Sequence, residues 1–478
     1  MSAELAQHIP PRELAERGAS RLTVTGWGRY PRSTAQVWRP EKLSALSAAL
    51  ANASKPVLAR GLGRAYGDAA INGGGSLIDL TRLNRMLAFD SQSGVLRCEA
   101  GVSFAELLQT FVPRGFFPPV TPGTKFVTLG GALAADIHGK NHHRDSSFSK
   151  HVVEFALMGP RGEIKRCSRQ ENSDLFWATL GGMGLTGVIL EIEFKLKRIE
   201  SAYLECESFA LPSIDHVLET FAEHDQRYQF SVAWVDCAAG PRNLGRSIAM
   251  FANFAPADRV RRFIGGHPLI VEQRRRLNLP FDLPQFVLNP WTMRSFSALY
   301  HLLHRRGERR RIVDLEQFFY PLDRLGNWNR LYGRRGFTQH QCVMPVAEGR
   351  DGLIETMEEL RRSRIPASLA VLKRFGEQQG MLSFPMPGYT LAMDFAVQTG
   401  LAELLNRLDR IVLKRGGRIY LAKDAFAQAE LVHQMYPNLA QWRAIKLSAD
   451  PDRIFSSQLS RRLNLDSGRA DACGALPR

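Results

Sequence analysis

The sequence predicts an α+β protein. Three observations favour this class: short apolar or alternating runs bounded by Gly, Asp and Asn, isolated amphipathic segments, and three glycine-rich clusters between them. The chain has 478 residues, of which 44% are hydrophobic and 23% charged, so two or three domains are expected. It contains 40 Gly and 25 Pro, near the usual background, which excludes collagen-like and low-complexity architectures.

The first 200 residues predict strands with a few helices between them. Strands are expected over residues 56–59, 76–80 and 95–98. A helix is expected over residues 104–112, because Ser103 and Glu106 form a capping-box pair, apolar residues then recur at helical spacing, and Pro113 ends the pattern.

A second unit is expected to begin near residue 199, where glycine becomes less frequent. Its candidate core or cleft aromatics are Phe221, Tyr228, Phe230 and Trp234. The last 70 residues predict a helix over 401–412, a break at the next glycine pair and a strand over 418–421, and these elements could complete either unit.

The cysteines and the N-terminal residues carry little functional signal. Six cysteines (Cys98, Cys167, Cys206, Cys237, Cys342 and Cys473) lack CxxC or metal-binding spacing, so we expect small buried or idle thiols. No window has about 18 uninterrupted apolar residues, and residues 1–32 lack the order of a signal peptide, which predicts a cytoplasmic protein.

The positive charge is concentrated in one stretch. The chain has 63 Lys and Arg against 47 Asp and Glu, and residues 259–311 contain 12 Arg, no Lys and three acids. Aromatic and aliphatic residues alternate with these arginines. A surface for anionic lipid is therefore one interpretation and a solvated, mobile loop is the other; nucleic acid is disfavoured, because no binding motif accompanies the charge.

The first glycine cluster, residues 60–68, directly follows a predicted strand. Residues without Cβ let backbone N–H groups converge on an anion, so the cluster predicts either a phosphate contact or a structural turn. Its spacing is GxGxxxG and no clear amphipathic helix follows, so the dinucleotide-binding fingerprint is not met.

The second cluster covers residues 122–143 and combines small residues with three histidines. The small residues would let a flat or phosphorylated ligand approach a helix N-terminus closely. No metal is expected at His138, His142 and His143, because HExxH is absent, acids are few, and Lys140 puts a positive charge among them.

The third cluster, residues 181–187, contains a formal GxGxxG. A helix-like segment precedes it and a strand-like segment follows, the reverse of the dinucleotide-binding order, so a close-packed turn is expected.

Read together, the clusters resemble the FAD-binding domain of the vanillyl-alcohol oxidase superfamily. The chain further resembles the decaprenylphosphoryl-β-D-ribose oxidase family, the flavoprotein half of a 2′-epimerase that makes an arabinose donor. The anchors are TGWGR (25–29), ARGLGRAYGD (59–68), PGT (122–124), GGALAADIHGKNHH (130–143), LFWAT (175–179), GMGLTG (182–187), LSFPMPG (382–388) and AKD (422–424).

The resemblance implies a two-part FAD-binding domain of vanillyl-alcohol oxidase (PCMH) type and an antiparallel-sheet substrate domain. We place the FAD-binding domain at 1–201, the substrate domain with basic mobile loops (259–311) at 202–412, and a C-terminal segment returning to the FAD-binding domain at 413–478. FAD is expected to be noncovalent. Covalent relatives carry a flavin-linking His in the first loop, where this chain has Arg64 after Gly63, and residues 59–72 contain neither His nor Cys.

The resemblance also implies site residues. FAD contacts are expected at Ala59, Arg60, Gly61, Leu62, Gly63, Arg64, Ala65, Tyr66, Gly67, Asp68, Ala69, Gly123, Thr128, Leu129, Gly130, Gly131, His138, Gly139, Lys140, Asn141, Ile189 and Tyr420. Lys423, Tyr66 and His138 are expected to be catalytic, and Gln339, Gln341, Lys373 and Lys423 to contact substrate.

The implied activity is oxidation of the 2′-hydroxyl of a polyprenylphosphoryl-β-D-ribose to the 2′-keto sugar, the first half of an epimerisation that supplies arabinose to cell-envelope polysaccharide. An NAD-dependent short-chain reductase is the implied partner, with peripheral membrane contact through the basic loops. Two positions depart from the family: Ala392 stands where mycobacterial members have a cysteine that reacts with covalent inhibitors, and Thr390 replaces a pocket Asn.

Two other functions stay open on the sequence. An aldonolactone or alditol oxidase acting on a soluble sugar uses the same flavin fold. A flavin-binding or membrane-scaffold protein without enzymatic activity belongs to a different class.

Overall fold

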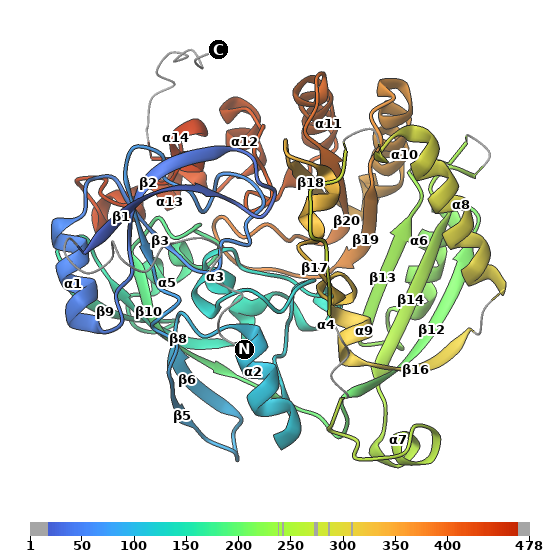
Figure 1. Cartoon of the computed structure of the whole chain (residues 1–478), viewed down its shortest axis with the longest axis horizontal. Helices are drawn as coiled ribbons and strands as arrows, with labels where there is room; N and C mark the ends of the chain where they lie inside the picture. The colour runs from blue at the N-terminus through green and yellow to red at the C-terminus, as the bar shows by residue number, and fades with distance from the viewer. Residues whose placement is uncertain are drawn as a thin grey trace.

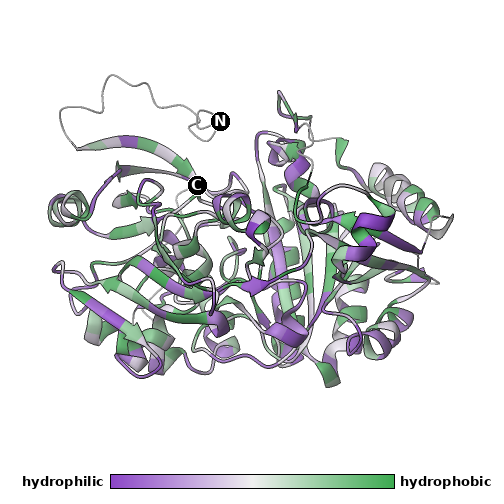
Figure 2. Ribbon diagram, turned by 90° about the horizontal axis from the view of Figure 1, so that it is seen from below, coloured by the Kyte–Doolittle hydropathy of each residue, from purple (hydrophilic) through white to green (hydrophobic). Residues whose placement is uncertain are grey.

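The structure is a computed structural model that describes residues 18–237, 239–240, 243–271, 276–284, 287–306 and 309–466. Figure 1 shows one lobe in which the N-terminal strands lie beside the C-terminal helices, and a second lobe built on a large sheet. Green hydrophobic segments run through the strands of both lobes, with hydrophilic purple segments between them (Figure 2).

The first lobe begins with a four-stranded sheet of order β1-β2-β4-β3. Its strands are β1 (Ala19–Thr25), β2 (Arg32–Trp38), β3 (Val57–Arg60) and β4 (Ser76–Asp79), and helix α1 (Leu43–Asn52) connects β2 with β3. Strands β3 and β4 pair in parallel and confirm two of the predicted strands.

A five-stranded antiparallel sheet of order β5-β6-β10-β8-β9 completes this lobe. Its strands are β5 (Met86–Phe89), β6 (Val95–Glu99), β8 (Val152–Met158), β9 (Ile164–Ser168) and β10 (Val188–Lys195). The helices beside it are α2 (Phe104–Phe111), α3 (Leu129–Ala134) and α5 (Ser173–Thr179), whereas α4 (His142–Asp145) contacts β19 (Leu369–Phe375) of the second lobe. The predicted capping box is confirmed, because Ser103 and Glu106 bond each other's backbone N–H at the start of α2.

The second lobe is built on an eight-stranded antiparallel sheet of order β16-β12-β14-β13-β19-β20-β18-β21. Its strands are β12 (Tyr203–Leu211), β13 (Phe230–Val235), β14 (Ser247–Phe254), β16 (Arg310–Asp314), β18 (Phe337–Pro345), β19 (Leu369–Phe375), β20 (Gly388–Ala396) and β21 (Arg418–Ile419). Strand β21 is shorter than predicted, because the chain turns after Ile419 and the Lys423 amide donates to the carbonyl of Tyr420.

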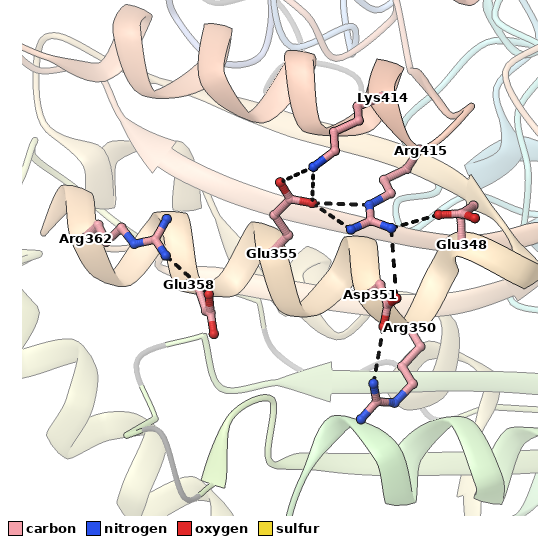
Figure 3. Close-up of polar contacts among 8 residues, drawn as sticks. All are labelled: Glu348, Arg350, Asp351, Glu355, Glu358, Arg362, Lys414 and Arg415. Carbon is pink, nitrogen blue, oxygen red and sulfur yellow. Dashed lines mark hydrogen bonds and ion pairs between the residues drawn. The ribbon is translucent and has the colours of Figure 1, made fainter.

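Helices cover both faces of this sheet. On one face α6 (Ile214–His224), α10 (Val346–Ser363) and α11 (Leu401–Lys414) share a hydrophobic core with the strands. On the other face lie α8 (Pro290–Arg306) and α9 (Leu315–Phe319). An ionic network joins α10 to α11 and its C-cap at the surface, with Glu355 paired to Lys414 and Arg415 and with Glu348 paired to Arg415 (Figure 3).

Of the C-terminal helices, α13 (Leu439–Ala449) and α14 (Gln458–Arg462) pack against the first lobe, whereas α12 (Ala429–Met435) packs against α11 and β21 of the second lobe. The Val57 amide donates to the carbonyl of Ile454 at 2.7 Å, and the Trp442 indole N–H donates to the carbonyl of Ala178 at 2.9 Å. The three domain limits given above stay a prediction.

The basic stretch is more regular than expected. It forms most of helix α7 (Ala257–Phe263), helix α8, the start of β16 and the short strand β15 (Leu277–Asn278), which pairs in parallel with β17 (Leu325–Gly326). The prediction of loops is therefore wrong for these segments, where apolar residues at helical spacing separate the arginines. Arg274 and Arg275 lie outside the described residues.

The cysteines behave as predicted where the structure describes them. Cys98, Cys167, Cys206 and Cys342 are buried free thiols and Cys237 is a half-buried one, whereas Cys473 lies outside the described residues. No cluster of potential metal ligands occurs in the described part of the chain. The described helices likewise include none with the length and apolar character needed to cross a bilayer.

Candidate active site

A cavity of about 530 Å³ lies between the two lobes. One side is formed by the glycine-rich segments of the first lobe, which we call the loop wall. The other side is formed by side chains of β13, β14, β18, β19 and β20 together with Lys423, which we call the sheet wall. The volume falls within the range of about 300–1,000 Å³ that is usual for ligand and cofactor sites.

The first glycine cluster leaves β3 and runs along the loop wall. In the described part of the chain, the backbone amides of residues 61–65 donate to no other group. The Arg60 guanidinium donates to the carbonyls of Ala70 and Thr25 at 2.5 and 2.7 Å and so fixes the loop from behind. A Cβ on Gly63, whose φ is +61°, would lie 2.2 Å from that guanidinium. The loop is thus both a structural turn and a row of free amides, which suits an anionic ligand.

The second cluster touches the first. Thr128 caps α3, since its hydroxyl accepts the Gly131 amide at 3.2 Å. A Cβ on Gly61 would lie 2.1 Å from the same hydroxyl, and one on Gly130 would lie 2.9 Å from the Cβ of Ala100. These glycines are needed for the close approach of the loop, the helix and a ligand.

The third cluster has the inverted order that the sequence predicted, since α5 precedes it and β10 follows. A Cβ on Gly182 would lie 2.2 Å from the carbonyl of Ala178, which confirms a close-packed turn. Sequence reasoning missed that Met183, Gly184 and Gly187 also line the cavity. The motif itself is the available signal, although its order is the wrong one for a dinucleotide fold.

All but four of the predicted FAD contacts line the cavity. The exceptions are Gly67, Asp68, Leu129 and Asn141. A Cβ on Gly67 would lie 1.8 Å from the carbonyl oxygen of Asp424, and the Asp68 carboxylate pairs with Arg462 at 2.7 Å. Leu129 is fully buried in the core, and the Asn141 amide donates to the carbonyl of Pro119 at 2.8 Å. These four residues support the wall from behind.

Lys423 enters the cavity from the turn after β21. Its Nζ lies 3.7 Å from the centre of the Tyr66 ring, close enough for a cation–π contact. Burial is the main cause that lowers the pKa of Lys423 to about 7; Asp394 opposes this shift, and nearby Lys373 adds a smaller lowering effect. Burial also raises the pKa of Tyr66 well above its usual value, so its hydroxyl stays protonated.

His138 lies where the two walls meet. Its Nε2 is 2.9 Å from the side-chain nitrogen of Gln341, and its ring packs against Phe375 and Tyr420. Burial lowers the pKa of His138 well below its usual value, so the ring is neutral. Because the Gln341 amide donates to Nε2, the proton resides on Nδ1, which is buried without a partner in the described residues.

Gln339 and Gln341 share a face of β18, two residues apart. The side-chain nitrogen of Gln339 donates to Asp394 at 2.6 Å, and that of Gln341 donates to the Thr390 hydroxyl at 3.2 Å. Both amide groups are fixed by their nitrogens, which leaves their carbonyl oxygens as acceptors without a partner in the described residues. Such acceptors suit sugar hydroxyls.

Asp394 and Lys373 add charge to the sheet wall. Burial raises the pKa of Asp394 to about 6 and lowers that of Lys373 to about 8. Sequence reasoning did not find Asp394, although a carboxylate inside the apolar run of β20 was the available signal. Thr390 and Ala392, the two departures from the family pattern, lie on β20, and Ala392 lines the cavity.

The walls fit a bound flavin nucleotide. Free amides at residues 61–65 suit phosphate oxygens, the glycines leave room where a Cβ would clash, and the protonated Nδ1 of His138 lacks an acceptor.

Comparisons with known proteins agree with this fit. Residues 32–168 match the model of the family described as FAD binding domain. The decaprenylphosphoryl-β-D-ribose oxidase of Mycolicibacterium smegmatis is 40% identical over 453 residues, which cover 92% of this chain and 97% of that protein. The chain belongs to the decaprenylphosphoryl-β-D-ribose oxidase family. It is therefore an FAD-dependent oxidoreductase that acts on a CH–OH group.

Two further relatives place this family in a wider group. An uncharacterised protein of Streptomyces coelicolor is 33% identical over 76% of this chain and all of its own length. An L-gulono-1,4-lactone dehydrogenase of Mycobacterium tuberculosis is 22% identical over 91% of this chain and 98% of its own. The decaprenylphosphoryl-β-D-ribose oxidase family is thus the nearer relation, and the lactone-oxidising enzyme is similar at a lower level.

Proposed function

We propose that this protein oxidises the 2′-hydroxyl of a polyprenylphosphoryl-β-D-ribose to the 2′-keto sugar, with FAD held noncovalently in the loop wall. The observation that carries the proposal is the convergence of Lys423, Gln339 and Gln341 on one cavity with the free amides of the loop wall. The first loop contains no His or Cys that could link a flavin covalently.

Oxidation of a secondary alcohol removes a proton from oxygen and a hydride from carbon, and bound FAD supplies the hydride acceptor. The 2′-hydroxyl loses its proton to the neutral amine of Lys423, whose pKa of about 7 suits general-base catalysis at physiological pH. The fixed carbonyl oxygens of Gln339 and Gln341 accept the remaining sugar hydroxyls and orient the ring. The phenol of Tyr66 packs against Lys423 and keeps water from the amine.

The lipid phosphate needs a cation beside the sugar. Lys373 lines the cavity on β19, and Lys140 lies on the opposite wall. Lys140 donates to the carbonyl of Phe318, and burial lowers its pKa to about 7. A phosphodiester between the two would favour their charged forms and offset the cost of burying them.

Anaerobic mixing of the yellow holoprotein with polyprenylphosphoryl-β-D-ribose tests the proposal. The readout is the absorbance of the oxidised flavin at about 450 nm. We expect this substrate to bleach the band and a free sugar lactone to leave it unchanged. Bleaching by the lactone alone would favour a soluble aldonolactone oxidase instead. Bleaching by neither would favour a binding protein.

We also propose that the protein contacts the membrane peripherally through its basic stretch. Nine of the 14 large apolar side chains that are exposed in the described residues lie there: Phe263, Ile264, Ile270, Leu277, Phe281, Trp291, Leu299, Leu302 and Leu303. Exposed Arg261 and Arg262 lie beside them on α7. Apolar residues enter the headgroup boundary while arginines attract anionic lipid.

Flotation with phosphatidylglycerol vesicles tests this contact. Replacement of Arg261 and Arg262 by Gln should weaken binding, and salt should weaken it further. The matched control replaces Arg361 and Arg362, an exposed arginine pair on α10. Equal loss in both pairs, or binding that salt does not change, would contradict a specific basic surface.

We further propose that an NAD-dependent short-chain reductase takes up the keto sugar. A ketone made by oxidation becomes the epimeric alcohol only when hydride returns to its other face, so a separate reductant is required. A coupled assay with such a reductase and NADH should convert the ribose lipid into the arabinose lipid, and accumulation of ketone alone would argue against the partnership.

A further inference from the structure

We infer that the prenyl chain of the substrate binds across the apolar end of the sheet wall, beneath helix α8. This inference rests on the proposed function, because it requires a lipid-linked sugar. Five side chains make up the proposed site, which we call the apolar strip: Val371 and Leu369 on β19, Val232 and Trp234 on β13, and Met250 on β14.

Strand register places the apolar strip next to the sugar end of the cavity. Gln341 pairs with Ala392, Ala392 with Val371, and Val371 with Trp234. Val232 in turn pairs with Met250 on the next strand. Directly paired residues point to the same face of a sheet, so one continuous surface runs from Gln341 to Met250.

The chemistry of this surface changes within a single strand. Every second residue of β19 lies on the same face of the sheet, and Leu369, Val371 and Lys373 are such a set. Lys373 is the cation proposed for the lipid phosphate, and the residues beyond it on β19, β13 and β14 that line the cavity are apolar. A phosphodiester at Lys373 would thus direct its hydrocarbon chain along the apolar strip.

Helix α8 forms a roof over the strip. It contacts β12 and β14, and the Tyr300 ring lies 4.7 Å from the Trp234 ring, centre to centre. Figure 1 shows α8 running alongside these strands. Met293 is buried on the inner side of α8, whereas Trp291 and Leu303 are 77% and 61% exposed. The helix therefore has apolar residues toward the sheet and toward the outside.

Space remains between the roof and the sheet. Protein interiors are normally packed without voids, yet Val232, Trp234, Met250 and Tyr300 all line the cavity, so the contact between the Trp234 and Tyr300 rings does not fill the space beside it. The outer residues of α8 belong to the surface proposed to contact the bilayer, so a prenyl chain can pass from lipid to the strip at the edge of α8. The first isoprene units would then replace the missing packing.

Chain length in the substrate tests the inference. Burying one methylene group is worth about a fourfold change in binding, so kcat/KM should be higher for farnesylphosphoryl-β-D-ribose than for methylphosphoryl-β-D-ribose.

A variant of the apolar strip tests the same point. Met250→Gln keeps the side-chain shape but places an amide in the strip, so it should lower the ratio of kcat/KM for the farnesyl substrate to that for the methyl substrate about tenfold. The control Met386→Gln changes a half-buried methionine outside the cavity and should keep the ratio. Equal ratios in Met250→Gln and wild type, or no dependence on chain length, would overturn the inference.

A turnover-independent probe separates this inference from the proposed function. Farnesyl phosphate with a diazirine on its last isoprene unit is photolysed with the holoprotein, and the labelled peptides are sequenced. Label on β13, β14 or α8 that excess farnesyl phosphate removes is the expected result, even if no sugar reduces the flavin. Label elsewhere would overturn the subsite, whereas failure of both ribose substrates with correct labelling would overturn only the oxidase activity.

Discussion

The loop wall and the sheet wall of the cavity present different atoms to a ligand. The loop wall offers backbone amides at residues 61–65 and glycines packed against Thr128 and Ala100. The sheet wall offers long side chains, among them Gln341 and Lys373, that project from neighbouring strands. A backbone cradle can hold a phosphate without depending on side-chain identity. A surface made of side chains can instead change its substrate specificity through single replacements, such as that at Ala392.

The two walls also differ in how they are held. Arg60 and the Thr128 cap fix the loop wall from within its own lobe. The sheet wall depends on residues far apart in the chain, since Lys423 reaches the cavity beside β18. At the seam between the walls, Arg462 of α14 pairs with Asp68 behind the loop wall and with Asp424 next to Lys423. We therefore expect changes in the sheet wall to alter reaction rate and changes at the seam between the walls to alter stability.

The largest expected effect comes from Lys423→Met. Loss of the amine removes the group that takes the hydroxyl proton, so flavin reduction by substrate should slow by about 10²- to 10⁴-fold while FAD stays bound. Stopped-flow absorbance measures this rate. Lys414→Met, at an exposed lysine on α11, is the matched control. Reduction of the Lys423→Met protein at the normal rate would remove Lys423 from the mechanism.

The pH dependence sharpens the assignment of the sheet wall. Because burial lowers the pKa of Lys423 to about 7, the amine gains a proton as the pH falls below this value, and the reactive neutral form is lost. The rate of flavin reduction should fall about tenfold per pH unit below about 7 and level off above about 8. Lys423→Arg should abolish this inflection, because arginine stays charged. A wild-type rate that rises toward acid pH would contradict the assignment.

Gly67→Ala tests the seam between the walls. A Cβ there would lie 1.8 Å from the backbone carbonyl of Asp424, next to Lys423, and neither backbone can move freely. We expect the free energy of unfolding to fall by about 1–3 kcal/mol. Gly240→Ala is the control, because its Cβ would meet nothing within 4 Å. Urea titrations of both variants should separate them; equal stability would show that the seam adapts.

The smallest effect is expected on the outer side of the sheet lobe. Glu355→Gln breaks the ion pairs with Lys414 and Arg415, which are exposed or half-buried (Figure 3). Such pairs contribute about 0–1 kcal/mol, and salt screens them. Thermal unfolding should show a small loss in low salt and none in high salt, and a loss that persists in high salt would indicate a packing role.

The loop wall could be predicted from sequence to a greater extent than the sheet wall. Its residues are contiguous and its glycines mark turns, so the motifs at 59–68 and 130–141 identified most of it. The sheet wall joins residues from Val232 to Lys423 through strand register, which no local pattern encodes. Met250 is not predicted for that reason. Asp394 has a local signal, its carboxylate inside the apolar run of β20, but its place at the cavity depends on register. The sequence predicts loop for α8 because the charge of the segment obscures its helical spacing.

The most direct test of the account is a stopped-flow comparison of farnesylphosphoryl-β-D-ribose carrying deuterium at C2′ with the same substrate carrying deuterium at C3′. If the two walls hold the 2′-carbon for hydride loss, deuterium at C2′ should slow flavin reduction and deuterium at C3′ should not. Two results would contradict the account. One is slowing by the C3′ label alone; the other is flavin reduction that neither label slows, in a reaction whose product has an unchanged C2′ centre.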